Sequence, residues 1–127
     1  MNTDQASVPT WITRLFASID RKDSKTFVSF LTEDGRFRFA NQDPVQGREA
    51  VAAAVEGFFS SIASLNHRIE RIWIHSDSVV CHGEVTYGRL DGNSITLPFA
   101  DIFQMQDDLV SDYLIYMDVT PLYAETQ

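Results

Sequence analysis

Residues 81–103 read CHGEVTYGRLDGNSITLPFADIF and contain the strongest hairpin signal in the chain. Apolar and polar residues alternate on both sides of Asp91 and Gly92. An Asp-Gly pair between two alternating segments is typical of a tight β-hairpin. The stretch therefore predicts two antiparallel strands, at 79–89 and 94–105.

The register of this hairpin is expected to bring a carboxylate and an imidazole together. A two-residue turn puts Leu90 opposite Asn93, and pairing outward from there puts His82 opposite Asp101. Since side chains alternate between the faces of a strand, one face then mixes polar with aromatic groups. That face carries His82, Glu84, Thr86, Phe99, Asp101 and Phe103, and the other carries Cys81, Val85, Tyr87, Ala100 and Ile102.

The mixed face predicts a cavity. An aspartate is costly to bury without a partner, and Phe99 and Phe103 do not suit a solvent-exposed face. A pocket with apolar walls and a few convergent polar groups accommodates both. The opposite face, which bears Val85 and Tyr87, is more uniformly apolar. We expect a homodimer, because a second subunit would cover that face.

The rest of the chain supplies helices and further strands. Apolar residues at helical spacing indicate helices before the hairpin, and period-two segments indicate strands around it. We expect a helix from Pro9 to Ile19, a short helix from Phe27 toward Gly35, a strand at 37–41, a loop at 43–47, a helix at 48–65, and strands at 67–75 and 109–118. Separate helices and antiparallel strands indicate an α+β domain spanning 1–127, with an ordered core at about 9–123.

Composition excludes several classes of partner. The chain has 127 residues, 44% of them hydrophobic, with a formal net charge of −8. This charge argues against nucleic acid and against an anionic membrane surface. We expect a cytoplasmic protein, because neither a leader-like segment nor an apolar run of spanning length is evident.

We expect neither a metal nor a cofactor. Cys81 is the single cysteine, and His67, His75 and His82 lack the spacing of paired metal ligands. No glycine-rich phosphate loop or dinucleotide fingerprint is present. The expected partner is a small-molecule ligand.

Several motifs together resemble one family. The stretches LTEDGRFRFAN, VQGREAV, GEVTYGRLDG, LPFADIF and YLIYMDVTPL occur in that order between Trp11 and Tyr123. In order and spacing they resemble the SnoaL-like branch of the nuclear transport factor 2-like superfamily. The resemblance implies a cone-shaped α+β barrel, with three helices packed on a curved, mostly antiparallel sheet that encloses a pocket. This scaffold hosts isomerases, cyclases, hydrolases, dehydratases and non-catalytic binders, so the resemblance implies fold more than chemistry.

The resemblance to ketosteroid isomerases is partial. Asp101 matches the aspartic acid that those enzymes keep neutral to donate a hydrogen bond to the developing oxyanion. Leu15 occupies the place of their tyrosine, and Phe39 or Asn41 lies near the place of their general base. We therefore do not expect steroid isomerisation.

The resemblance to limonene epoxide hydrolase-like proteins is also partial. Phe39 and Asn41 match the Tyr-x-Asn portion of their site. Glu84, Thr86 and Ile115 stand where the charged residues of that site are expected. Epoxide hydrolysis is therefore not expected either, and the acid/base aspartate of SnoaL-type polyketide cyclases has no clear counterpart.

Asp101, His82 and Glu84 are the candidate catalytic residues. Between Phe99 and Phe103, Asp101 should have a raised pKa and could donate to a carbonyl oxygen; its alternative is a structural hydrogen bond. His82 could act as a base or form only a cross-strand pair. Glu84 could be a second acid/base group or a solvated residue near the pocket mouth.

The candidate ligand-binding residues come from both the hairpin and the resemblance. The alternation that the resemblance implies for the last strand turns Tyr113, Ile115 and Met117 toward the cavity. The full candidate set is Phe39, Asn41, Thr86, Phe99, Phe103, Tyr113, Ile115, Met117 and Leu15. Asn41 could instead serve a turn, and packing or capping would explain His67.

Three functions remain open from the sequence. The first is binding of an apolar, carbonyl-bearing molecule, with cofactor-free isomerisation, cyclisation or dehydration by acid/base catalysis. The second is a non-catalytic carrier or sensor of a lipophilic metabolite. The third is a structural or partner-binding module.

Overall fold

The computed structural model describes residues 8–125 as four helices and six strands. The helices are α1 (Thr10–Asp20), α2 (Ser24–Val28), α3 (Arg48–Ser60) and α4 (Thr120–Tyr123). The strands are β1 (Leu31–Phe39), β2 (Val45–Gln46), β3 (Ser64–His75), β4 (Ser78–Gly88), β5 (Ser94–Gln106) and β6 (Leu109–Tyr116). The α+β class is confirmed, while β2 and α4 are additions to the expected elements.

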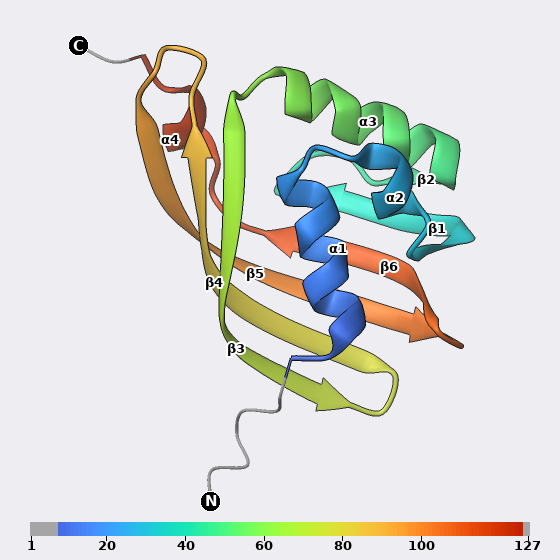
Figure 1. Cartoon of the computed structure of the whole chain (residues 1–127). Helices are drawn as coiled ribbons and strands as arrows, with labels where there is room; N and C mark the ends of the chain where they lie inside the picture. Colours follow the sequence, from blue (N-terminus) through green and yellow to red (C-terminus); the bar gives the residue numbers. More distant parts are fainter. Residues whose placement is uncertain (1–7, 126–127) are drawn as a thin grey trace, which may run out of the picture.

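The strands form one curved sheet with the order β2-β1-β6-β5-β4-β3. All neighbours are antiparallel except β1 and β6, which are parallel. The first and last strands of this order are not paired, so the curved sheet is open and does not close into the expected cone-shaped barrel. Helices α1, α2 and α3 cover one face, which we call the inner face, and the other is the outer face (Figure 1).

Helix α1 forms where the apolar spacing predicts it, whereas α3 ends at Ser60 and not at residue 65. Ile12, Leu15, Phe16 and Ile19 are the apolar residues of α1 and are all buried, so one stripe of the helix packs on the sheet. The second helix ends at Val28, well short of Gly35. Leu31 belongs instead to β1, where it pairs with Val110 of β6. This pairing stabilises the strand more than one further turn would stabilise a short helix.

The predicted register of the hairpin is wrong by one residue. Cys81, and not His82, is the partner of Asp101, and His82 pairs with Ala100. The connection is longer than a two-residue turn, because the last strand pair is Gly88 with Ser94. A shift of one residue moves every side chain of one strand to the other face relative to its partner.

The shift exchanges the predicted faces of β4. Cys81, Val85 and Tyr87 lie on the inner face beside Phe99 and Asp101 of β5, and all are buried. The outer face carries His82, Glu84, Thr86, Ala100 and Ile102. The predicted homodimer therefore loses its original basis, since Val85 and Tyr87 are covered within the chain.

A bulge in β3 bends the sheet at Gly83. The pairing of β3 with β4 shifts between Ile69 and Arg71, opposite this glycine. A Cβ atom at Gly83 would lie 1.9 Å from the carbonyl oxygen of Arg68, so only glycine fits there.

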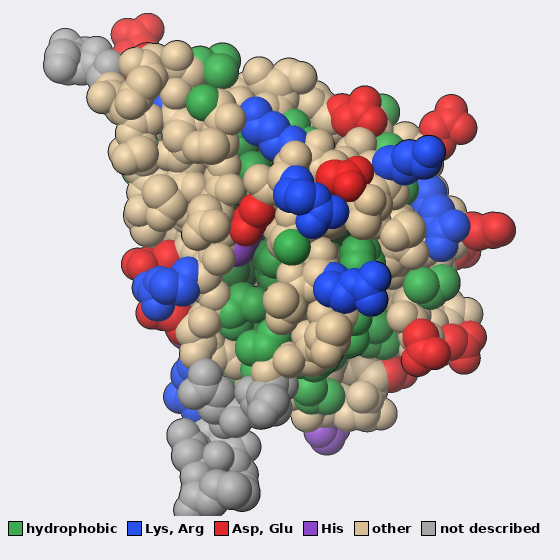
Figure 2. Space-filling view, viewed as in Figure 1, with side chains coloured by type: hydrophobic (Ala, Val, Ile, Leu, Met, Phe, Trp, Pro, Cys, Tyr) green, Lys and Arg blue, Asp and Glu red, His purple; other side chains and the backbone are tan. Residues whose placement is uncertain are grey.

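The helical side of the molecule presents a mixed surface. Figure 2 shows acidic and basic side chains spread over this side, with hydrophobic side chains between them near α1. No helix in the described part of the chain combines the length and apolar character needed to cross a bilayer.

Candidate functional site

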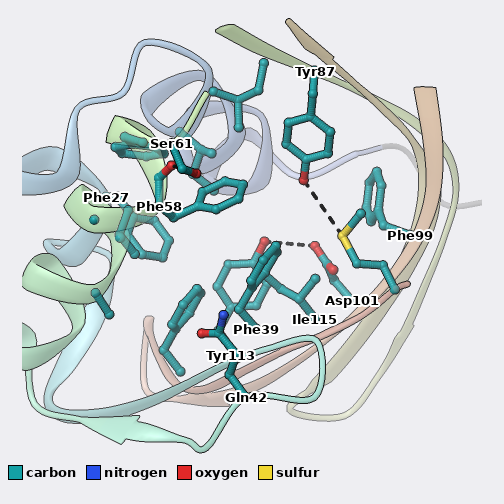
Figure 3. Close-up of a pocket in the computed structure, with 18 of the residues that line it drawn as sticks. Phe27, Phe39, Gln42, Phe58, Ser61, Tyr87, Phe99, Asp101, Tyr113 and Ile115 are labelled. Atoms are coloured by element: carbon teal, nitrogen blue, oxygen red, sulfur yellow. Dashed lines mark hydrogen bonds between the residues drawn. The ribbon is translucent and has the colours of Figure 1, made fainter. Parts of the chain in front are cut away.

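A cavity of about 320 Å³ lies between the helices and the inner face of the sheet. Its walls are mostly aromatic and aliphatic, as Figure 3 shows for the labelled phenylalanines. It is lined by Phe27, Phe37, Phe39, Phe58, Phe59 and Phe99, with Ile19, Val55, Leu65, Ile115 and Met117. The polar lining comes from Gln42, Ser61, His67, Tyr87, Asp101, Tyr113 and Tyr123. No lysine or arginine lines it within residues 8–125, and among these residues His67 is the one lining side chain that can become a cation.

Asp101 lies on the sheet side of the cavity, and among the described residues it is the one carboxyl that lines it. Its side chain projects from β5, and the residue is only 1% exposed. Burial raises the pKa of Asp101 to about 8, although a hydrogen bond from Tyr113 lowers it in part. A carboxyl with this pKa is mostly protonated at neutral pH.

Tyr113 of β6 fixes which oxygen of Asp101 carries that proton. Its hydroxyl donates to Asp101 Oδ2 over 2.8 Å, and the two groups point toward one another in Figure 3. Burial holds the pKa of Tyr113 well above its usual value, so the hydroxyl stays a donor. Asp101 Oδ1 has no hydrogen-bond partner among the described residues. The proton of the neutral acid is therefore assigned to Oδ1.

His67 and Asp20 form a second polar pair at the cavity. Asp20 is the last residue of α1, and its Oδ1 lies 2.6 Å from Nδ1 of the His67 ring. The Oδ2 atom of Asp20 accepts from the backbone N–H of His67 over 3.1 Å. A carboxylate can only accept, so Nδ1 carries the hydrogen and Nε2 is the acceptor in the neutral ring.

The ring of His67 is also fixed by aromatic contacts. It lies against Phe16 with ring centroids 4.7 Å apart and against Phe99 with centroids 5.3 Å apart. No other residue in the described part of the chain hydrogen-bonds its Nε2 atom. An oriented imidazole with a free nitrogen at a cavity is the arrangement of a general base.

The local sequence pattern does not predict this pair. Forty-seven positions separate Asp20 from His67, and only the packing of α1 on β3 joins them. The alternation of side chains along β3 does indicate that His67 is inside, because it shares a face of this strand with the buried Leu65. This alternation predicts a buried ring but does not identify Asp20 as its partner.

A short chain of hydroxyls borders the mouth of the cavity. The hydroxyl of Ser61, which follows α3, donates to the carbonyl oxygen of Phe58 over 2.6 Å. The hydroxyl of Tyr123, at the end of α4, lies 2.8 Å from Ser61 Oγ. Tyr123 is 52% exposed, so the cavity reaches the surface at this edge.

The structure places about half of the predicted site residues at the cavity. Those that line it are Asp101, Phe39, Phe99, Tyr113, Ile115 and Met117. His82, Glu84, Thr86, Asn41, Leu15 and Phe103 do not line it. The functional roles of the first group remain predictions.

His82 and Glu84 lie on the outer face, because the register differs from the predicted one. The Glu84 carboxylate is paired with Arg68 at 2.6 Å. The His82 ring stacks on Trp73, with centroids 5.6 Å apart. Thr86, on the same face, shares a hydrogen bond with Thr96. The structure therefore contradicts the predicted meeting of Asp101 with His82 and Glu84.

The other misplaced residues lie in the core or in a turn. Leu15 and Phe103 are fully buried, and Phe103 stacks on Tyr113 with centroids 4.4 Å apart. Phe103 thus packs against the ring of Tyr113, which lines the cavity. Asn41 is exposed in the turn after β1, as its alternative interpretation predicts, and the next residue, Gln42, lines the cavity.

Comparisons with solved structures agree on the fold. A protein with a ketosteroid isomerase-like fold from Catenulispora acidiphila, in complex with trimethylamine, is 14% identical with a TM-score of 0.84, and 91% of each chain is covered. A protein described as a SnoaL-like polyketide cyclase from Jannaschia sp. CCS1 is 19% identical with a TM-score of 0.79, covering 95% of this chain and 94% of that one. An LEH-like epoxide hydrolase from M. tuberculosis is 13% identical with a TM-score of 0.73, covering 88% and 83%.

Sequence comparison shows the family. No curated protein matches the chain. The family model described as the SnoaL-like domain matches residues 12–113, which is most of the chain and includes most of α1, the strands β1 to β5, the first part of β6 and Asp101. The chain therefore belongs to the SnoaL-like domain family.

Proposed function

We propose that the cavity binds an apolar, carbonyl-bearing small molecule and that Asp101, in its neutral form, donates a hydrogen bond to the carbonyl oxygen. The observation that carries the proposal is a buried carboxyl in an aromatic cavity, with Oδ2 bonded to Tyr113 and Oδ1 without a partner. A buried donor without an acceptor is costly, and a ligand oxygen would remove that cost. The trimethylamine in a structure of the same fold supports small-molecule binding in general.

The reaction that suits this cavity is cofactor-free proton transfer, as in isomerisation, cyclisation or dehydration. His67 Nε2 takes a proton from the carbon next to the ligand carbonyl, and the released electron pair moves toward the carbonyl oxygen. Asp101 Oδ1–H stabilises the negative charge that develops on this oxygen. His67 then returns the proton to carbon, and Asp20 holds the charged imidazole in place meanwhile. His67 thus takes the part that the predicted register gave to His82.

A second candidate function is a carrier or sensor of a lipophilic metabolite. Phe39 lines the cavity near the place where ketosteroid isomerases hold their general base, and Leu15 is a core residue where they hold a tyrosine. These replacements favour binding without turnover.

A methyl ketone on a flat apolar ring system tests both candidates. We expect 2-acetylnaphthalene to bind, and Asp101→Val to weaken binding by roughly threefold to tenfold, the range for one hydrogen bond. In deuterated water, turnover appears in NMR as exchange of the methyl protons next to the carbonyl. The wild-type protein should accelerate this exchange and His67→Gln should abolish the acceleration, with ketone binding retained.

Each outcome decides between the candidates. Binding without accelerated exchange favours the carrier or sensor. Absence of binding, or equal binding by wild type and Asp101→Val, contradicts the proposed function. Tyr116→Phe is the matched control, because this tyrosine is 50% exposed and lies on β6 without lining the cavity.

A further inference from the structure

The hydroxyl chain at the cavity mouth has a defined direction. Ser61 Oγ–H donates to the carbonyl oxygen of Phe58. A hydroxyl has a single hydrogen, so Ser61 has none left for Tyr123. In the 2.8 Å contact between them, Tyr123 must therefore donate and Ser61 must accept.

This direction leaves Tyr123 with only an acceptor to offer a ligand. Its hydrogen is committed to Ser61, while its oxygen keeps lone pairs. Tyr123 lines the cavity and is 52% exposed, so this oxygen lies at the outer end. Gln42 also lines the cavity, but its amide has both a donor and an acceptor. It therefore does not distinguish a ligand donor from a ligand acceptor.

The two ends of the cavity are thus opposite in hydrogen-bonding character. At the inner end, Asp101 presents a donor to an acceptor oxygen. At the outer end, Tyr123 presents an acceptor. Within residues 8–125 no lysine or arginine lines the space between them, where six phenylalanines form the walls. An anionic group on the ligand would find no counter-charge at either end.

We propose that the mouth is a specificity subsite, and that the ligand is an uncharged, flat, mostly aromatic molecule with a carbonyl at its inner end and a hydrogen-bond donor, such as a hydroxyl, at its outer end. This inference rests on the proposed function, since it requires the carbonyl to bind at Asp101. Ser61 acts as a positioning residue, because it holds the Tyr123 hydroxyl in the donating orientation.

Three matched probes test the subsite. They are 6-acetyl-2-naphthol, its methyl ether, and 6-acetyl-2-naphthoate, all with the ketone used above. The naphthol offers a donor, the ether offers only an acceptor, and the naphthoate carries a negative charge. We expect the naphthol to bind roughly threefold to tenfold more tightly than the ether, as for one partly exposed hydrogen bond. The naphthoate should bind at least about tenfold more weakly than the naphthol.

Variants of Tyr123 and Ser61 test whether the preference for the naphthol over the ether arises at the mouth of the cavity. Tyr123→Phe keeps the ring and removes the acceptor, so the naphthol and the ether should bind equally. Ser61→Ala should reduce the preference, because the Tyr123 hydroxyl is then free to turn. Tyr116→Phe is the control and should retain the full preference, since Tyr116 does not line the cavity.

The results separate this inference from the proposed function. If 2-acetylnaphthalene binds through Asp101 but naphthol and ether bind equally to the wild type, the subsite is wrong and the proposed function stands. The subsite is also wrong if Tyr123→Phe leaves the preference intact. If none of the ketones binds, the proposed function fails, and this inference fails with it.

Discussion

At the scale of single residues, Asp101 makes the stability of the fold depend on pH. Its pKa is about 8 in the folded chain, against 3.8 for an exposed aspartate, so the folded state holds the proton more tightly. The stabilisation is fully present below about pH 4 and is lost as the pH rises to about 8. In this window one proton contributes a slope of about −1.4 kcal/mol per pH unit to the free energy of unfolding.

Asp101→Asn tests this dependence because the amide does not titrate. Urea unfolding of both proteins between about pH 5 and pH 8 should show the variant gaining stability relative to the wild type as the pH rises. Equal slopes for the two proteins would mean that Asp101 is ionised in the folded state.

The hydrogen bond from Tyr113 lowers the pH at which ketone binding is lost, because it lowers the pKa that burial has raised. Binding requires the neutral acid, so affinity for 2-acetylnaphthalene should fall above about pH 8. Because the hydrogen bond from Tyr113 lowers the pKa of Asp101, Tyr113→Phe should move this midpoint to higher pH. Affinity measured by calorimetry as a function of pH checks the shift, with Tyr116→Phe as the control. If the midpoint stays in place or falls in Tyr113→Phe, the hydrogen bond from Tyr113 does not lower the pKa of Asp101.

The sequence predicts Asp101 and fails to predict His67 for one physical reason. Asp101 stands out locally, since Phe99 and Phe103 on the same face show that its side chain is buried. His67 becomes notable only through Asp20, which arrives from a different element. The spacing of residues along one element cannot predict a pair that forms only when two elements pack together.

At the scale of elements, the hairpin shows what a turn motif decides. Asp91 and Gly92 do lie in the connection, and both strands extend as predicted. The backbone N–H of Arg89 donates to the carbonyl of Asn93, which makes the loop longer than the two-residue type. The alternation within β4 by itself favours one polar side with His82, Glu84 and Thr86, which is the outer face where they lie, whereas the register taken from the turn predicted that they line the cavity. A hydrophobic pattern is thus a firmer guide to register than the identity of the turn.

Gly83 and Gly57 form a matched pair that tests the bulge in β3. A Cβ at Gly83 would meet the backbone of Arg68, whereas at Gly57 nothing lies within 4 Å. Gly83→Ala should lower the free energy of unfolding by more than about 2 kcal/mol, since backbone must move. Gly57→Ala, inside α3, should leave stability unchanged or raise it by up to about 1 kcal/mol. Chemical denaturation measures both, and a mild effect at Gly83 would mean that the bulge adapts easily.

At the scale of the whole molecule, we propose that two chains associate through the outer face of the sheet. Trp73 and Tyr116 on this face are 41% and 50% exposed, and Ile102 lies half-buried near them. A second copy would cover these apolar groups. Light scattering should give twice the chain mass of 14.4 kDa.

Charged substitutions locate this interface. Ile102→Glu combined with Tyr116→Arg should yield monomers. Leu90→Arg, in the hairpin loop at 70% exposure, should leave the mass unchanged. A wild-type protein that is monomeric at micromolar concentration would rule out the dimer.

¹³C NMR of the aspartate carboxyl groups shows whether the acid at the wall of the aromatic cavity is neutral. The Asp101 signal is assigned as the one that Asp101→Asn removes. We expect this signal to have the shift of a protonated acid at neutral pH and to titrate near pH 8. An Asp101 signal that titrates near the ordinary value of about 4 would contradict it.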